Sequence, residues 1–308
     1  MGLTGPTQCR RVEGTKRATN RVQRGEFQRF VGVDLGGGKG KKTALAVLER
    51  RGDDVAVVTL LPRAGEAPLY DGPLVEFLRR AGDHALLCID APLTLPPCLR
   101  CQVVTCPGQE ACIDPAVVQM RRLGGAPLEP SRDYRRGKPP VTPYTQRATE
   151  VYLQRRRGLI ARETLGQGMG PLTARAAHLR RALGDLYQLD RNLIEVYPKA
   201  TLQVLNLGEP YKKRPDARLR LLECLPGLTF APGVWREECV QSDHAFDAIL
   251  CAYTGYLYAR EGWTHPEEME IRAGIDGWIW TPPDPAAAAT AEPEAIELPP
   301  RRKSEPGV

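Results

Sequence analysis

Long apolar runs are missing from this sequence. No stretch of the 308 residues approaches the roughly 18 uninterrupted apolar residues that a membrane-spanning helix needs. Residues 1–28 are polar and rich in arginine, so they also lack the apolar core of a signal peptide. These absences exclude a membrane protein, and we expect a cytoplasmic one. With 42% hydrophobic and 26% charged residues, the composition is that of a globular protein, which excludes collagen, a coiled coil and complete disorder.

Positive charge is concentrated in one part of the chain. The net charge is +6, but residues 115–191 alone hold fifteen Lys and Arg against six Asp and Glu, a net +9. The remainder of residues 31–280 is therefore acidic. An acidic centre beside a basic segment suits a cation-dependent enzyme that acts on a polyanion, although a solvated basic helix face gives the same count. The residues expected to contact nucleic acid are Tyr144, Arg155, Arg156 and Arg157.

Hydrophobic patterning places one α/β domain at residues 29–280, between two tails. Residues 1–28 have no hydrophobic period and residues 281–308 are rich in Pro, Ala and Glu, so both tails are predicted to be disordered. Strands are expected at 30–34, 43–48, 55–61, 85–91 and 192–197, and helices at 73–80, 212–225 and 243–260. Short links between the first three strands predict an antiparallel meander, and the apolar run 85–91 is typical of a central parallel strand. Residues from about 93 to 190 form an expected insertion with a cysteine loop and a basic, mostly helical segment.

Four of the nine cysteines fall within fifteen residues. Cys98, Cys101, Cys106 and Cys112 follow the pattern C-x2-C-x4-C-x5-C. Four thiolates in one short loop are the ligand set of tetrahedral zinc or of a 4Fe–4S cluster. The sequence therefore predicts a metal at the loop 98–112, and the spacing leaves zinc and iron–sulfur both open.

Several carboxylates stand at strand ends or share one helix face. Asp34 and Asp90 close apolar strands, and Glu195 lies inside another strand. An ionised Asp in an apolar strand costs several kcal/mol unless it is paired or bound to a cation. Asp243 and Asp247 are four residues apart, which places them on the same face of a helix. Together these acids predict a common site for Mg²⁺ or Mn²⁺, because such hard cations prefer carboxylate oxygens.

Four pieces of the sequence carry a resemblance to a known family. They are Val31-Gly32-Val33-Asp34, Cys88-Ile89-Asp90-Ala91-Pro92, Ile194-Glu195-Val196-Tyr197-Pro198 and Ser242-Asp243-His244-Ala245-Phe246-Asp247-Ala248. From about Phe30 to Trp280, the chain resembles the predicted nuclease family called domain of unknown function number 429. That family is placed with the ribonuclease H-like and Holliday-resolvase-like proteins.

The resemblance implies a ribonuclease H-like sheet, with three antiparallel strands followed by parallel strands and flanking helices. It also implies that Asp34, Asp90 and Asp247 hold catalytic metals, with Asp243 as a less direct match. Glu195 lies in a family motif and is a candidate site residue whose role stays open. His244 stands where the family often has an acid, so it is either a proton shuttle or a residue of the helix face.

The predicted function is hydrolysis of phosphodiester bonds in DNA or RNA at a two-metal carboxylate site. Two alternatives stay open. One is an actin-like or sugar-kinase-like phosphotransferase, which the glycine-rich turn after Asp34 would suit. The other is a nucleic-acid-binding protein without catalysis. Nucleic acid is the expected partner, and no membrane association is expected.

Overall fold

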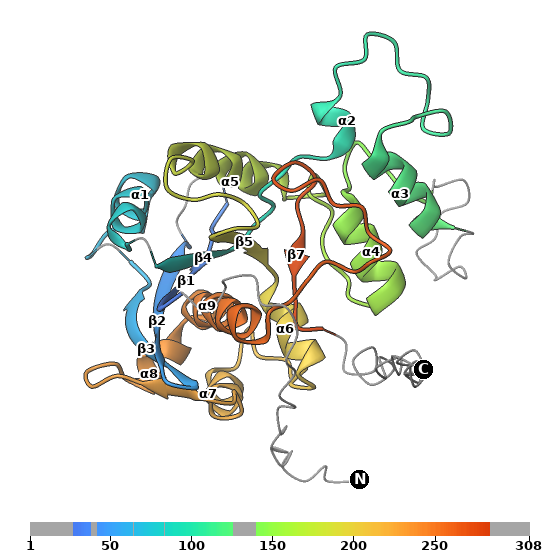
Figure 1. Cartoon of the computed structure of the whole chain (residues 1–308). Helices are drawn as coiled ribbons and strands as arrows, with labels where there is room; N and C mark the ends of the chain where they lie inside the picture. Colours follow the sequence, from blue (N-terminus) through green and yellow to red (C-terminus); the bar gives the residue numbers. More distant parts are fainter. Residues whose placement is uncertain (1–26, 38–41, 64, 83, 126–139, 284–308) are drawn as a thin grey trace, which may run out of the picture.

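The computed structural model describes residues 27–37, 42–63, 65–82, 84–125 and 140–283. The predicted tails, apart from a few residues, and part of the basic segment (126–139) lie outside the described residues. The described chain is built on a seven-stranded mixed sheet in the order β6-β3-β2-β1-β4-β5-β7, with helices on both faces (Figure 1). This confirms the predicted α/β class with antiparallel and parallel strands.

The strands at the centre of the sheet agree with the sequence patterning, and those at its edges are additional. The strands are β1 (Arg29–Asp34), β2 (Ala44–Arg51), β3 (Asp54–Leu61), β4 (Ala85–Asp90), β5 (Leu193–Val196), β6 (Leu228–Phe230) and β7 (Ile279–Trp280). The first three form the predicted antiparallel meander. β4 pairs in parallel with β1 and with β5, so it is the expected central strand. The edge strands β6 and β7 are too short to carry a readable period.

Alternation along the strands divides the apolar side chains between two layers. Val33 and Ile89 belong to the layer covered by α1 and α5, whereas Phe30 and Cys88 belong to the layer covered by α6, α7, α8 and α9 (Figure 1). The covering helices are α1 (Asp71–Arg80), α5 (Gly170–Ala182), α6 (Pro198–Val204), α7 (Pro215–Glu223), α8 (Arg236–Gln241) and α9 (Asp243–Glu261). A side chain's position along its strand therefore decides which helices it meets.

The chain between β4 and β5 extends the molecule to one side of the sheet (Figure 1). It contains α2 (Pro97–Arg100), α3 (Pro115–Gly124) and α4 (Ala148–Arg157) before α5. Met120 of α3 and Val151 of α4 belong to the same apolar layer as α9. Among the helices of the described chain, none combines the length and apolar character that crossing a bilayer requires.

Helix α9 lies unusually close to the sheet because two glycines leave room for it. A Cβ on Gly32 of β1 would fall 2.0 Å from the carbonyl oxygen of Ala248, and one on Gly255 of α9 would fall 2.2 Å from Cys88 Sγ. Neither contact is possible for a real Cβ, so both positions need glycine. The helix begins as predicted at the N-cap Ser242, whose hydroxyl accepts a hydrogen bond from the His244 backbone amide at 3.2 Å. The close packing brings the first turns of α9 against the end of β1.

Candidate functional site

Two carboxylates meet at the carboxyl ends of neighbouring parallel strands. Asp34 closes β1, Asp90 closes β4, and the two residues are register partners. Register partners in a parallel pair point to the same face, and the strands are about 4.8 Å apart. That face is the one covered by α9, because Asp34 and Asp90 alternate with Val33 and Ile89, which belong to the other layer. The site therefore forms where β1, β4 and the start of α9 come together.

His244 of α9 is bound directly to Asp34. The His244 Nδ1 and Asp34 Oδ2 atoms are 2.6 Å apart, and only 9% of Asp34 is exposed. The hydrogen bond with Asp34 raises the pKa of His244, and the carboxylate charge adds to this effect against the opposing effect of burial. The Nε2 atom lies 3.8 Å from Asp243 Oδ1. His244 therefore holds its second proton more readily than a free imidazole does.

Asp247 lies one turn further along α9 and is almost completely buried. Its Oδ1 accepts a hydrogen bond from the Tyr211 hydroxyl at 2.8 Å, and its Oδ2 is paired with Lys212 Nζ. The same ammonium group is 3.9 Å from Asp243 Oδ2. Burial and the charge of Asp34 raise the pKa of Asp247 to about 6, despite the opposing effects of Lys212 and Tyr211. The cluster thus holds more negative charge than Lys212 neutralises.

Asp90 shows the same excess of negative charge. Its pKa is well above the usual range, first because of burial and then because of the charges of Asp34 and Asp247. Lys212 acts in the opposite direction. Three mutually repelling carboxylates suit a divalent cation, which would relieve the repulsion. In the described part of the chain, however, no group of three or more His, Cys, Asp or Glu side chains is arranged to hold a metal ion, and Lys212 lies against Asp247.

A family model described as "Protein of unknown function (DUF429)" matches residues 32–271. The chain belongs to this family. The match covers the carboxylate cluster and the cysteine loop, and it confirms the family resemblance found in the sequence. The searches of curated proteins and of solved structures gave no match.

Glu195 of this DUF429 protein lies on the other face of the sheet from the three aspartates, although its charge still adds to the raised pKa of Asp90. It is the register partner of Ile89, so its side chain lies on the opposite face of the sheet from Asp90. There Arg147 donates two hydrogen bonds to its carboxylate, at 2.6 and 2.8 Å, and the Leu93 amide donates a third at 2.9 Å. Arg147 is also paired with Glu150, and all three charged side chains are buried. The contacts of Glu195 are those of a buried ion pair that ties β5 to the chain after β4 and to the start of α4.

The residues predicted to contact nucleic acid lie in α4 and in the segment before it. Arg156 Nε is paired with Glu268 at 3.3 Å on the surface, and Arg157 donates hydrogen bonds to Thr281 and to the carbonyl of Pro282. Arg155 is half-buried, and Tyr144 is 54% exposed. Thr281 follows β7 directly, and β7 runs parallel to β5. Arg157 is thus at the same edge of the sheet as Asp34, two strands beyond β4.

Of the four clustered cysteines, Cys98 lies in α2 and the other three lie in the segment that joins α2 to α3. Cys98, Cys101 and Cys106 are exposed, and Cys112 is half-buried. Burial raises the pKa of the Cys98 thiol, and the neighbouring thiols Cys112, Cys106 and Cys101 raise it further. The loop therefore brings the four sulfur atoms within electrostatic reach of one another.

Three positively charged residues with buried partners near the strand ends are not marked by the sequence patterns. Lys212 neutralises part of the carboxylate charge, and its neighbour Tyr211 bonds Asp247. Arg175 of α5 donates to the carbonyl of Gly36 and to the Thr43 hydroxyl, at 2.7 and 2.6 Å, and so fixes the turn that follows Asp34. Arg147 holds Glu195. For Lys212, the local signal that could have been used is its place beside Tyr211 just before a helix.

Proposed function

We propose that this protein is a metal-dependent nuclease with a ribonuclease H-like fold. The observation that carries the proposal is the cluster of Asp34, Asp90 and Asp247 where β1, β4 and the start of α9 meet, with the charge of Asp34 opposing the ionisation of the other two. The central strand order β3-β2-β1-β4-β5, with only β2 antiparallel to its neighbours, supports the ribonuclease H-like assignment.

The carboxylates of Asp34, Asp90 and Asp247 would hold Mg²⁺ or Mn²⁺, with Asp243 at the rim. Bound there, a pair of such ions activates water and stabilises the leaving oxygen of a phosphodiester. Lys212 occupies part of this space by pairing with Asp247, but its side chain is 55% exposed. Because more than half of the side chain is exposed, we propose that it moves from Asp247 to a substrate phosphate while remaining at the site.

Positive side chains near the cluster supply contacts for a polyanion. Tyr197, at the end of β5, has its pKa raised by burial and by the nearby charge of Asp90, and Arg162 and Lys212 oppose that rise. Arg162 and Lys212 are therefore within electrostatic reach of the carboxylate edge. Guanidinium and ammonium groups bind phosphate oxygens, and Tyr197 adds an aromatic surface on which a base can stack. We propose DNA or RNA as the partner that lies along this edge.

His244 is placed to move a proton. Its Nδ1 is held by Asp34, so Nε2 is the nitrogen that can exchange a proton with a water or with a leaving oxygen. The Asp34 carboxylate raises the pKa of the ring, which keeps it protonated to higher pH. We propose that His244 donates a proton during hydrolysis.

The test is a cleavage assay on single- and double-stranded DNA and RNA with Mg²⁺ or Mn²⁺, using the wild type and Asp34→Asn. Mutating a residue that only hydrogen-bonds to a metal ligand lowers metal affinity or activity by about 10- to 100-fold. Asp34 is a proposed ligand itself, so we expect Asp34→Asn to lower the cleavage rate by at least about 100-fold. Asp54→Asn is the matched control, because Asp54 is exposed and begins β3 at the opposite edge of the same sheet. We expect it to keep wild-type activity.

Cleavage that persists in Asp34→Asn, or in excess chelator, would refute the carboxylate site. Absence of cleavage with every substrate and both metals would refute the nuclease assignment. In that case, salt-sensitive binding without turnover would favour a nucleic-acid-binding protein, and hydrolysis of ATP would favour a phosphotransferase.

A further inference from the structure

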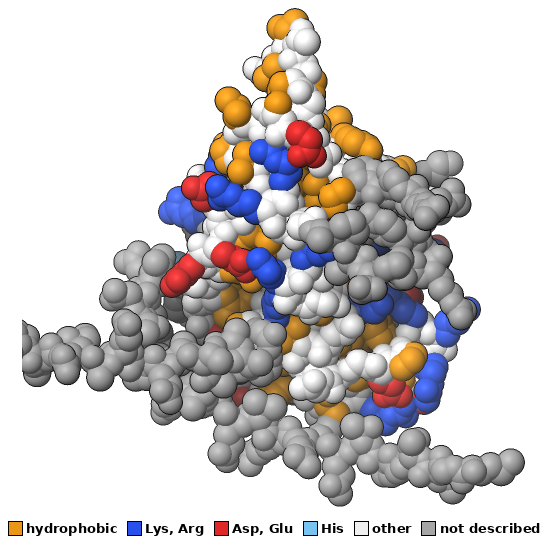
Figure 2. Space-filling model, turned by 90° about the vertical axis from the view of Figure 1, so that its right-hand side faces the viewer, with side chains coloured by type: hydrophobic (Ala, Val, Ile, Leu, Met, Phe, Trp, Pro, Cys, Tyr) orange, Lys and Arg blue, Asp and Glu red, His pale blue; other side chains and the backbone are white. Residues whose placement is uncertain are grey.

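The cysteine loop between α2 and α3 stands away from the sheet (Figure 1). Figure 2 shows this end of the molecule as a narrow projection with hydrophobic side chains near its tip. Val103, Val104 and Ile113 are 62%, 101% and 90% exposed. None of the three belongs to either apolar layer of the protein. A loop of this length without secondary structure is uncommon in a compact domain, and this one has no apolar core to order it.

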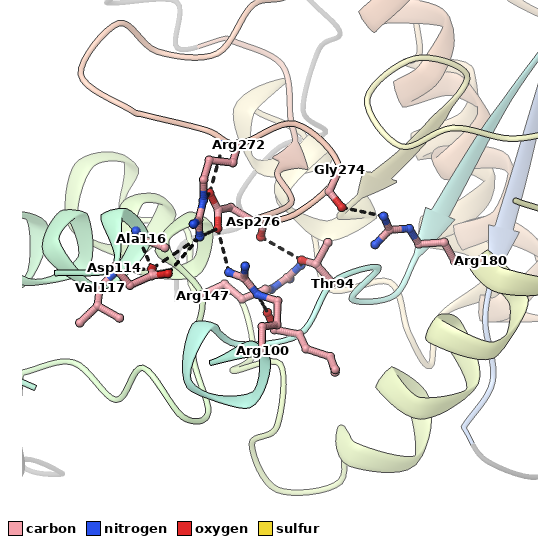
Figure 3. Close-up of polar contacts among 11 residues, drawn as sticks. Thr94, Arg100, Asp114, Ala116, Val117, Arg147, Arg180, Arg272, Gly274 and Asp276 are labelled. Carbon is pink, nitrogen blue, oxygen red and sulfur yellow. Dashed lines mark hydrogen bonds and ion pairs between the residues drawn. The ribbon is translucent and has the colours of Figure 1, made fainter. Parts of the chain in front are cut away.

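Both ends of the loop are fixed by one chain of ion pairs (Figure 3). At the first end, Arg100 donates to Asp276 Oδ1 at 2.7 Å. At the other end, Asp114 caps α3 by accepting from the Ala116 amide at 2.9 Å. Arg272 joins the two, because it donates to Asp276 at 2.6 Å and to Asp114 at 3.3 Å. The two ends are thus held together.

The interior of the loop has one further support from outside. Arg121 of α3 donates hydrogen bonds to the carbonyls of Gln109 and Cys112, at 2.5 and 2.9 Å. These bonds orient the second half of the loop. Three of the four loop thiols are exposed and Cys112 is half-buried, whereas Cys88, Cys239 and Cys251 are buried. The four loop thiols therefore do not serve as small core residues.

We propose that Cys98, Cys101, Cys106 and Cys112 bind one zinc ion, which closes the loop around a tetrahedral centre of four thiolates. The four thiols fall within fifteen residues of chain, and the anchored ends of the loop limit the movement that is needed to bring the sulfur atoms together. In the described residues they do not yet form a closed ligand set. Closure by the metal itself is the usual behaviour of small zinc sites, where binding and ordering are one event and the thiol protons are released to water.

The exposure of the loop favours zinc over an iron–sulfur cluster. Cys98, Cys101 and Cys106 are open to solvent. The surroundings of an iron–sulfur cluster control its potential through solvent exposure and hydrogen bonds, so a cluster here would be unprotected. Zinc has no redox chemistry and tolerates this exposure. The site lies apart from the carboxylates, and the proposal does not depend on the proposed nuclease activity.

The test is metal analysis of the full chain, purified anaerobically without chelator. We expect one zinc ion per chain in the wild type and at least about tenfold less in Cys101→Ser/Cys106→Ser. Cys239→Ala is the matched control, since this thiol is buried elsewhere, and Asp34→Asn separates the loop from the carboxylate cluster. Both should keep the full zinc content.

A second measurement covers the case in which the double variant fails to fold. Cobalt added to chelator-treated wild type should give the visible absorption of a tetrahedral thiolate complex, and zinc should remove it. Chelation should also expose residues 101–112 to a protease while the circular dichroism of the fold is kept. If the purified protein contains no zinc and added cobalt gives no such absorption, the proposal is overturned. Iron with acid-labile sulfide overturns it as well, in favour of a cluster.

Discussion

Asp90→Asn should stabilise the metal-free protein at alkaline pH. The carboxylates of Asp34 and Asp90 end neighbouring parallel strands about 4.8 Å apart. At an effective dielectric constant of about 20, two charges about 5 Å apart repel by about 3 kcal/mol. Lys212 cancels part of this repulsion, so we expect a net gain of about 2 kcal/mol. In a protein of this size, that corresponds to a rise of about 3 °C in the unfolding temperature.

The pH dependence fixes the sign of the effect. The pKa of Asp90 is raised in the folded protein, so the folded state binds this proton more tightly than the unfolded state does. The stability of the wild type must then fall as the pH rises above the unfolded value of about 4, and the loss grows until the pH passes the folded pKa. The variant has no such proton. The two proteins should therefore unfold at similar temperatures near pH 4 and diverge toward pH 8.

The assay is thermal unfolding between pH 4 and 8 in chelator, with Asp54→Asn as the control for the same change at an exposed position. Mn²⁺ should stabilise the wild type at pH 8 and have less effect on Asp90→Asn, because one ligand is missing. An Asp90→Asn protein that unfolds at a lower temperature than the wild type at pH 8 would show that the carboxylates do not repel one another, and the reasoning behind the metal site would fail.

Two further predictions concern the fold around the site. Arg147→Met leaves the buried carboxylates of Glu150 and Glu195 unpaired, so the free energy of unfolding, measured by urea denaturation at pH 7.5, should fall by about 3–5 kcal/mol. Adding Glu195→Gln should recover part of this loss, and no recovery would contradict the pairing. Gly32→Ala should lower the free energy of unfolding by about 3 kcal/mol or more, because its Cβ would fall 2.0 Å from the Ala248 carbonyl. Gly72→Ala, at an unobstructed position of α1, should be neutral or stabilising, and equal effects would refute the close approach.

The strand-end carboxylates can be predicted from the sequence because their signal is local. An Asp that ends an apolar strand is unusual within a few residues of sequence, and both Asp34 and Asp90 have that context. The helix that carries Asp247 is also predictable, since Ser242 and the apolar residues after it mark its start. The amino-acid pattern alone is therefore enough to identify the parts of the site that depend on short stretches of chain.

The contacts of Glu195 and Arg147 depend on tertiary pairing. Glu195 is an acid in an apolar strand, as Asp90 is, but an offset of one residue in the pairing turns its side chain to the opposite face. That register is set by the pairing of β4 with β5, across a segment of about a hundred residues. Arg147 contributes to the basic count of residues 115–191, yet it is 1% exposed. A sum of charges cannot distinguish a buried guanidinium from one that faces a substrate.

The burial of Glu195 against Arg147 affects how a mutational survey of this protein should be read. Substitutions at Glu195 and at Asp34 would both reduce the total activity of a cell extract. At Glu195 the loss would come from fewer folded molecules, since unpaired buried charges shift chains toward degradation. At Asp34 the amount of protein would be preserved and each molecule would turn over more slowly. Dividing activity by the soluble amount of each variant separates the two residues.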